Sequence, residues 1–152
     1  MVDTSHDIRT LNGLIATVID SAEGYSESAK DIEGGRFGAI FTSRAAERRQ
    51  VAASLQGEVV RLGGNPEDDG TILASAHRLF VNLKSTVTGS DDKAIVDEVE
   101  RGEDHIKAKF EAAMQDGDVS PQVQSVIKDA YASVRQGHDQ MRDIKHAMEG
   151  QA

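Results

Sequence analysis

Four long stretches of this sequence carry apolar residues at alternating spacings of three and four, which is the period of one face of an α-helix. They cover about residues 4–33, 37–62, 91–114 and 121–148. In the first stretch the pattern is carried by Ile8, Leu11, Ile15, Val18, Ala22, Tyr25, Ala29 and Ile32. No convincing strand pattern is visible in the sequence. The chain is therefore predicted to be all-α, with four long amphipathic helices.

Residues that typically end or begin helices separate these stretches. Two glycines at 34–35 follow the first stretch, and glycine readily adopts the left-handed conformation in which many helices end. The run "GGNPEDDG" (63–70) ends the second stretch. Ser90 is expected to cap the third helix, and Ser120, followed by Pro121, is expected to begin the fourth.

A fifth, shorter helix is predicted over about residues 71–87, inside the connection between the second and third long helices. A helix of about 17 residues is roughly 25 Å long, which is close to the length of such a bundle. We therefore expect it to cross back along the bundle, so that the second and third long helices run parallel. This is the topology of a ferritin-like four-helix bundle, whereas an up-down-up-down bundle would need only a short turn here.

The composition fits one domain of this kind and argues against nucleic-acid binding. A chain of 152 residues can form a sizeable core, and residues 1–152 are treated as a single domain. Aromatic residues make up only 4% of the chain, which suits a bundle packed with Ala, Val, Ile and Leu. The formal net charge of −9 repels phosphate backbones, so no nucleic-acid partner is expected.

Other classes are excluded by what the sequence lacks. There is no cysteine, so disulfides and thiolate metal sites are excluded. The first residues do not have the pattern of a secretory signal, and no apolar run approaches the roughly 18 residues of a membrane span. We expect a soluble, cytoplasmic protein without membrane contact.

One carboxylate interrupts the apolar face of the third helix. In "EVERGEDHIKAKFEAAM" (98–114), Glu103 occupies the place between Val99 and Ile106 on that face. In the crossover topology, each long helix has a side chain of metal-ligand type about ten residues inward from one end of the bundle. These side chains are Glu23, Glu47, Glu103 and His138. Three carboxylates and one imidazole at one level would suit Fe, Mn or Zn.

Two arginines near the same level support a different interpretation. Arg44 and Arg48 lie on the inward side of the second helix, and two guanidiniums repel a cation. In a purely structural cluster Glu103 would pair with Arg48 or Arg44, and His138 would hydrogen-bond to Glu23. Both interpretations stay open. Close backbone packing is expected beside this level, where three glycines fall inside helices: Gly24, Gly102 and Gly137.

A set of motifs in a fixed order resembles one bacterial family. The motifs are "LNGLIATVIDSAEGY" (11–25), "LQGEVVRLGGNPEDDG" (55–70), "HRLFVNLKS" (77–85) and "RGED" (101–104). Over nearly its whole length the chain is similar to bacterial ferritin-like four-helix-bundle proteins that are catalogued chiefly as a domain of unknown function. The resemblance implies the ferritin-like fold and does not imply an activity.

The sequence departs from the pattern of ferritin-like di-iron proteins, which generally carry Glu-x-x-His on two helices. The corresponding places read "ERRQ" (47–50) and "RQGH" (135–138), so one lacks the His and the other lacks the Glu. A standard di-iron oxidase centre is therefore not expected. A site for a single metal ion, or a bundle without its metal, fits better.

Two functions follow from these observations. One is a metal-binding bundle that serves in storage, sensing or minor redox chemistry. The alternative is a non-catalytic, stress-associated or interaction bundle with a metal-free buried ion-pair cluster. An enzyme is less expected, because no glycine-rich nucleotide motif is present. Assembly of the chain into a homo-oligomer is a further expectation.

Overall fold

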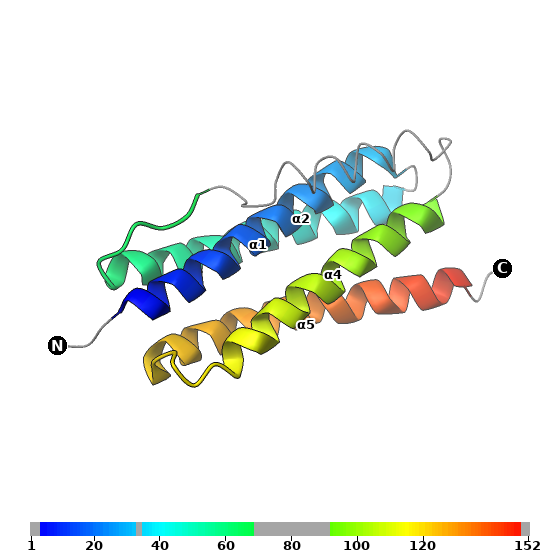
Figure 1. Cartoon of the computed structure of the whole chain (residues 1–152). Helices are drawn as coiled ribbons and strands as arrows, with labels where there is room; N and C mark the ends of the chain where they lie inside the picture. The colour runs from blue at the N-terminus through cyan, green and yellow to red at the C-terminus, as the bar shows by residue number, and fades with distance from the viewer. Residues whose placement is uncertain (1–3, 33–34, 69–91, 150–152) are drawn as a thin grey trace.

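The structure, a computed structural model, describes residues 4–32, 35–68 and 92–149, and in these ranges it is helical without any strand. Its four helices are α1 (Ser5–Asp31), α2 (Gly35–Arg61), α4 (Asp92–Met114) and α5 (Pro121–Glu149). They form an elongated bundle (Figure 1). The prediction of an all-α chain with four long helices is confirmed, and the short helix expected over 71–87 lies outside the described residues.

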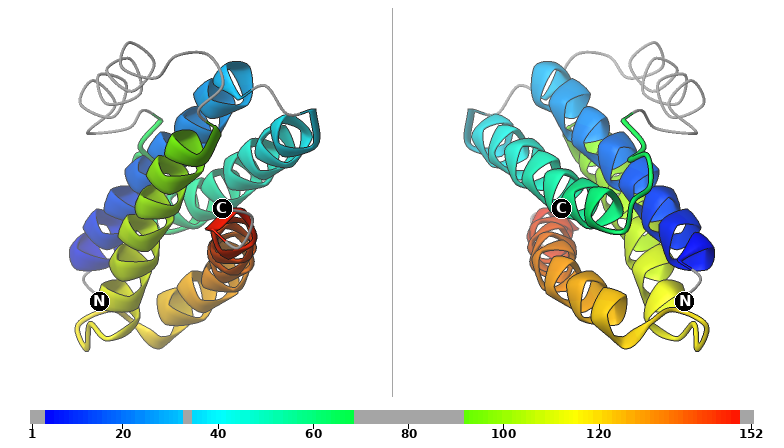
Figure 2. Two further views of the ribbon diagram at one scale, coloured as in Figure 1. Left: turned by 90° about the vertical axis from the view of Figure 1, so that its right-hand side faces the viewer. Right: turned by 90° about the vertical axis from the view of Figure 1, so that its left-hand side faces the viewer.

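The helices are arranged so that α2 and α4 run in the same direction. α1 packs against α2 and α4, and α5 packs against the same two helices, so α2 and α4 lie diagonally across the bundle. α1 begins, α2 ends and α4 turns into α5 at one end of the bundle, whereas α4 begins at the other end (Figures 1 and 2). This is the relative direction that the crossover topology requires of α2 and α4.

Two apolar clusters fill the bundle, one toward each end. The larger lies toward the end where α1 begins and includes one large buried side chain from each helix: Leu11, Leu55, Phe110 and Ile127. The smaller lies toward the other end and likewise draws on all four helices: Tyr25, Phe41, Val96 and Met141. None of the described helices combines the length and the apolar character needed to cross a membrane.

The end of α2 depends on two glycines for different reasons. Gly63 has a φ of +85°, a left-handed conformation that side chains with a Cβ rarely adopt. Its N–H donates to the carbonyl of Val60, and the N–H of Gly64 donates to the carbonyl of Val59, each at 2.9 Å. A Cβ on Gly64 would lie 2.9 Å from Cδ1 of Ile8 on α1. The predicted helix end at "GGNPEDDG" is confirmed, and the second glycine also permits close packing.

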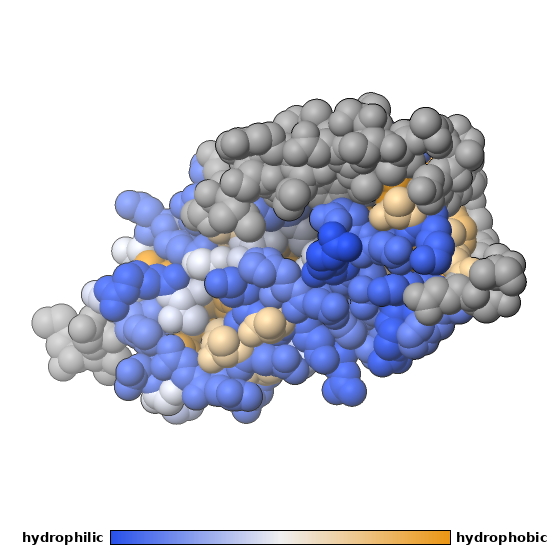
Figure 3. All heavy atoms as spheres, turned by 45° about the vertical axis from the view of Figure 1, so that its right-hand side comes forward, coloured by the Kyte–Doolittle hydropathy of each residue, from blue (hydrophilic) through white to orange (hydrophobic). Residues whose placement is uncertain are grey.

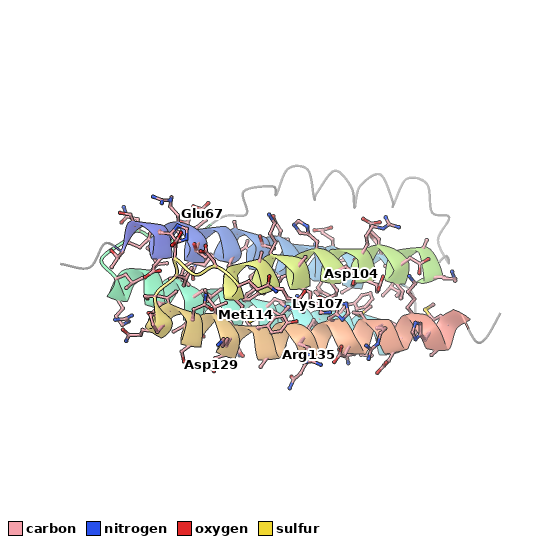
Figure 4. The ribbon with its side chains drawn as sticks, turned by 60° about the horizontal axis from the view of Figure 1, so that its bottom comes forward. Glu67, Asp104, Lys107, Met114, Asp129 and Arg135 are labelled. Atoms are coloured by element: carbon pink, nitrogen blue, oxygen red, sulfur yellow. The ribbon has the colours of Figure 1, made fainter. Side chains whose placement is uncertain are left out.

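The chain after α2 is held against α1 by one side chain. The amide of Asn12 donates to the carbonyl of Asn65 at 3.1 Å and accepts the N–H of Glu67 at 2.8 Å. Gln56 of α2 donates to the carbonyl of Glu67 at 2.8 Å. These bonds fix the path of residues 65–67 at the end of the bundle (Figure 4).

Candidate functional site

A buried ion pair crosses the centre of the bundle. Arg48 of α2 donates from Nη2 to Oε2 of Glu103 on α4 at 2.8 Å, and the two side chains are 0% and 1% exposed. Because α2 and α4 are diagonal neighbours, this pair spans the bundle axis. The carboxylate on the apolar face of α4 is therefore buried against a guanidinium, which is the pairing expected in the alternative interpretation.

The second oxygen of Glu103 is bound by α1. The hydroxyl of Tyr25 donates to Oε1 of Glu103 at 2.7 Å, and the Tyr25 ring lies 5.7 Å from the guanidinium carbon of Arg48. Tyr25 also contacts Phe41 of α2 edge to face. Burial, and then the negative charge of Glu103, raise the pKa of the Tyr25 hydroxyl well above its ordinary value. Tyr25 is therefore a neutral donor that holds Glu103 in place.

Arg48 also contacts the remaining helices. Its Nη1 donates to the hydroxyl of Ser21 on α1 at 2.8 Å, and Nη2 donates to the carbonyl of Val134 on α5 at 3.3 Å. Its Nε is buried without a hydrogen-bond partner. From α2, one guanidinium thus contacts α1, α4 and α5, and it fixes how the four helices are aligned along the bundle.

A glycine on α5 makes room for this guanidinium. A Cβ on Gly137 would lie 2.3 Å from Nη2 of Arg48 and 3.1 Å from Cδ of Arg44. Gly137 therefore packs closely against side chains of α2, whereas the sequence predicted close packing of backbone. A Cβ on Gly102 would meet nothing within 4 Å, so the same prediction is wrong for that position, and Gly24 is buried.

Glu47 lies beside this pair at the interface of α2 and α5. Its Oε1 accepts from Nη1 of Arg44 and from the hydroxyl of Ser133, each at 2.5 Å. Arg44 also donates to Oε1 of Gln140 at 2.7 Å. The side chain of Glu47 is about a third exposed, at 34%. Glu47 therefore orders Arg44 against α5.

The remaining two predicted ligands face other partners. Glu23 is half-exposed, and its Oε1 lies 3.5 Å from Nη2 of Arg49. His138 is buried, and its Nε2 lies 2.7 Å from Oδ1 of Asp104 on α4, which is labelled in Figure 4. Its Nδ1 lies 3.5 Å from Oδ1 of Asp139. The prediction that His138 hydrogen-bonds to Glu23 is wrong, because the imidazole is bonded to Asp104.

These contacts place the four predicted ligands near one level of the bundle without joining them as one donor set. Each of the four has its own partner, and the partners of the three carboxylates include Arg48, Arg44 and Arg49. The register estimate from the sequence therefore found the right level. Metal binding by Glu23, Glu47, Glu103 and His138 remains a prediction.

A different group of metal-ligand side chains meets at the end of the bundle. Donor atoms of His6, Asp116 and Asp118 lie within 4.8 Å of one another. Sequence reasoning missed this group, because His6 is at the start of α1 and the two aspartates are in the turn between α4 and α5. "DGD" (116–118) is a recognisable turn, but only the fold brings His6 beside it.

Fold and site together define an all-α bundle of four long helices with a buried arginine–glutamate pair at its centre. The chain belongs to the family described as domain of unknown function DUF2383, whose model matches residues 6–116. The matched range contains Tyr25, Arg48 and Glu103 and ends before α5. No curated protein matches the chain.

Proposed function

We propose that this chain is a non-catalytic interaction bundle of ferritin-like connectivity, whose core holds a guanidinium where a metal ion would otherwise lie. The parallel course of α2 and α4 supports the connectivity. The single observation that carries the proposal is the Arg48–Glu103 pair, which is fully buried and spans the bundle axis. The central carboxylate is neutralised by a positive charge that belongs to the chain itself.

The energetics support a metal-free centre. For Glu103 to bind a cation it would have to release Arg48, and an unpaired buried charge costs about 3–5 kcal/mol. The guanidiniums of Arg48 and Arg44 would then repel the incoming ion, by about 4 kcal/mol per unit charge at 4 Å when the effective dielectric constant is about 20. Both terms favour the ion pair over a metal ion.

The burial of the cluster supports a role other than catalysis. Tyr25, Arg48 and Glu103 are all buried, so a substrate would reach them only if the helices separated. A catalytic group must lie within hydrogen-bonding reach of the group on which it acts. The cluster instead sets the alignment of four helices, and a well-defined outer surface depends on that alignment.

The described surface favours a polar partner. Val60 is the only large apolar side chain that is exposed among the described residues. The face in Figure 3 is largely hydrophilic, with small separate apolar areas. With a net charge of −9, basic protein surfaces are the partners that electrostatics favours. A cytoplasmic location, and homo-oligomers as a further form of association, belong to the same proposal.

Metal content distinguishes this proposal from the metal-binding alternative. We would purify the wild-type protein without chelator, together with the double variant Glu103→Gln, His138→Gln, and measure Fe, Mn and Zn per chain by mass spectrometry. The expected result is the same metal content in both, because the core holds no ion. Circular dichroism would verify that the variant is folded.

The matched control is the double variant Glu111→Gln, His105→Gln, which changes the same residue types outside the core cluster. A stoichiometric metal that is present in the wild type and in this control, but absent from the core variant, would overturn the proposal.

A further inference from the structure

Three donor groups meet where the first turn of α1 approaches the turn between α4 and α5. His6 comes from α1, whereas Asp116 and Asp118 come from the turn, and their donor atoms lie within 4.8 Å of one another. Nε2 of His6 is 2.7 Å from Oδ2 of Asp116. Figure 2 shows these two chain segments side by side at the end of the bundle, in its right-hand view.

The turn is held in place relative to α1 by a buried carboxylate. Asp7, which is next to His6 in sequence, is 3% exposed, and its Oδ1 accepts the N–H of Ser120 at 3.0 Å. This bond ties the first turn of α1 to the residue just before α5. The three donor groups are therefore brought together by fixed backbone and do not depend on long, mobile side chains.

The turn itself is also ordered by hydrogen bonds. Oδ1 of Asp116 accepts the N–H of Asp118 at 2.9 Å, and Gln124 donates to the carbonyls of Ala113 and Asp116 at 2.9 and 3.1 Å. The N–H of Asp118 and the bond from His6 lower the pKa of the Asp116 carboxyl below its ordinary value. These hydrogen bonds hold the Asp116 carboxylate in place beside His6.

The chemistry of the three groups matches a first-row transition ion. Imidazole and carboxylate are the mixed ligands that Zn²⁺, Mn²⁺ and Fe²⁺ accept, whereas Mg²⁺ and Ca²⁺ prefer oxygen alone. Metal–ligand bonds of roughly 2.0–2.2 Å place neighbouring donor atoms about 3 Å apart. Nε2 of His6 and Oδ2 of Asp116 are hydrogen-bonded to each other at 2.7 Å, so a metal ion would replace the proton between these two atoms.

Access and charge also suit a cation. The side chains of His6 and Asp116 are 38% and 30% exposed, so an ion could enter without opening the bundle and could keep water as further ligands. Two carboxylates beside one imidazole make this site acidic, on a chain whose formal net charge is already −9. Unlike the core cluster, this group contains no guanidinium.

We propose that His6, Asp116 and Asp118 form a binding site for a divalent transition-metal ion, which links the start of α1 to the turn between α4 and α5. The site lies at the end of the bundle, away from the Arg48–Glu103 pair. It does not depend on whether the core is metal-free.

Titration calorimetry with Zn²⁺ on the wild-type protein tests this site, with Mg²⁺ as the comparison ion. We expect one Zn²⁺ per chain and much weaker Mg²⁺ binding. His6→Ala and Asp118→Asn should each weaken Zn²⁺ binding by about tenfold or more, because even outer-shell partners of metal ligands contribute roughly 10- to 100-fold. Asp118→Asn keeps the backbone N–H that orders the turn, so this variant tests the ligand without removing that bond.

The matched controls are His105→Ala and Asp129→Asn, which remove an exposed imidazole and an exposed carboxylate elsewhere. Both controls should bind Zn²⁺ as the wild type does, and circular dichroism would verify that all four variants are folded. Absence of Zn²⁺ binding by the wild type, or binding that His6→Ala and Asp118→Asn leave unchanged, would overturn this site. Metal lost only from the Glu103→Gln, His138→Gln variant would instead overturn the metal-free core.

Discussion

At the scale of single residues, the decisive feature is a carboxylate and a guanidinium that are both removed from water. Glu103 has a partner for each oxygen, in Arg48 and Tyr25, so its charge is compensated within the core. A buried ion pair need not stabilise a protein relative to apolar residues, but removal of one partner is costly. The effect of this ion pair is to fix which residues of the four helices face one another.

The substitution Arg48→Met should lower the free energy of unfolding by about 3–5 kcal/mol, because it leaves the charge of Glu103 buried and unpaired. The double variant Arg48→Met, Glu103→Met should recover much of this loss, since it removes both charges. Urea unfolding followed by circular dichroism measures both changes.

A second ion pair, on α4, supplies the control for these two variants. Arg101 on α4 is 72% exposed and forms an ion pair with Glu98, so Arg101→Met should cost less than about 1 kcal/mol. A double variant as unstable as Arg48→Met alone would show that the loss does not come from the unpaired charge.

At the scale of helices, α5 can approach α2 closely only because residue 137 has no side chain. A Cβ there would overlap the guanidinium of Arg48, which has no room to retreat because it also contacts α1 and α4. Gly102 on α4 has open space where its Cβ would be. Two helical glycines near one level of the bundle thus have opposite roles.

We therefore expect Gly137→Ala and Gly102→Ala to change stability in opposite directions. Gly137→Ala should be destabilising by about 1–3 kcal/mol, the usual cost of overpacking a core. Gly102→Ala should be stabilising by up to about 1 kcal/mol, because alanine favours a helix over glycine. Thermal and urea unfolding of the two variants measure this contrast, and a stable Gly137→Ala protein would contradict the close approach.

At the scale of the whole molecule, the buried hydroxyl of Tyr25 links folding to pH. The folded chain holds the Tyr25 proton more tightly than the unfolded chain, which releases it near pH 10. Above about pH 10 the unfolded state therefore binds fewer protons than the folded state, and the free energy of unfolding falls as the pH rises. Below this pH the hydroxyl is neutral in both states and adds no pH dependence.

Tyr25→Phe should remove this part of the alkaline loss, because no proton is then released on unfolding at that position. Urea midpoints measured from pH 8 to pH 11 should fall less steeply for Tyr25→Phe than for the wild type, although the variant is less stable at pH 8. The donor bond to a charged acceptor is worth about 1.5–3 kcal/mol. Parallel curves for the two proteins would contradict the assignment. Tyr131, whose pKa is also raised by burial, is present in both.

The sequence by itself determined the four long helices, the burial of Glu103 and the level at which polar side chains gather. These properties depend on the local period of apolar residues and on the number of residues along each helix. Both quantities can be read directly from the sequence. The parallel course of α2 and α4 follows from the length of the connection between them, which is long enough to return along the bundle.

Only the tertiary structure decided which polar groups meet. Arg44 and Arg48 are four residues apart, about 6 Å along the axis of α2, so the axial position of α2 relative to α4 decides which of them reaches Glu103. The same sensitivity gives His138 to Asp104 and leaves Glu23 near Arg49. His6 contacts Asp116, which lies 110 positions further along the chain, and only the packing of the helices brings the two together.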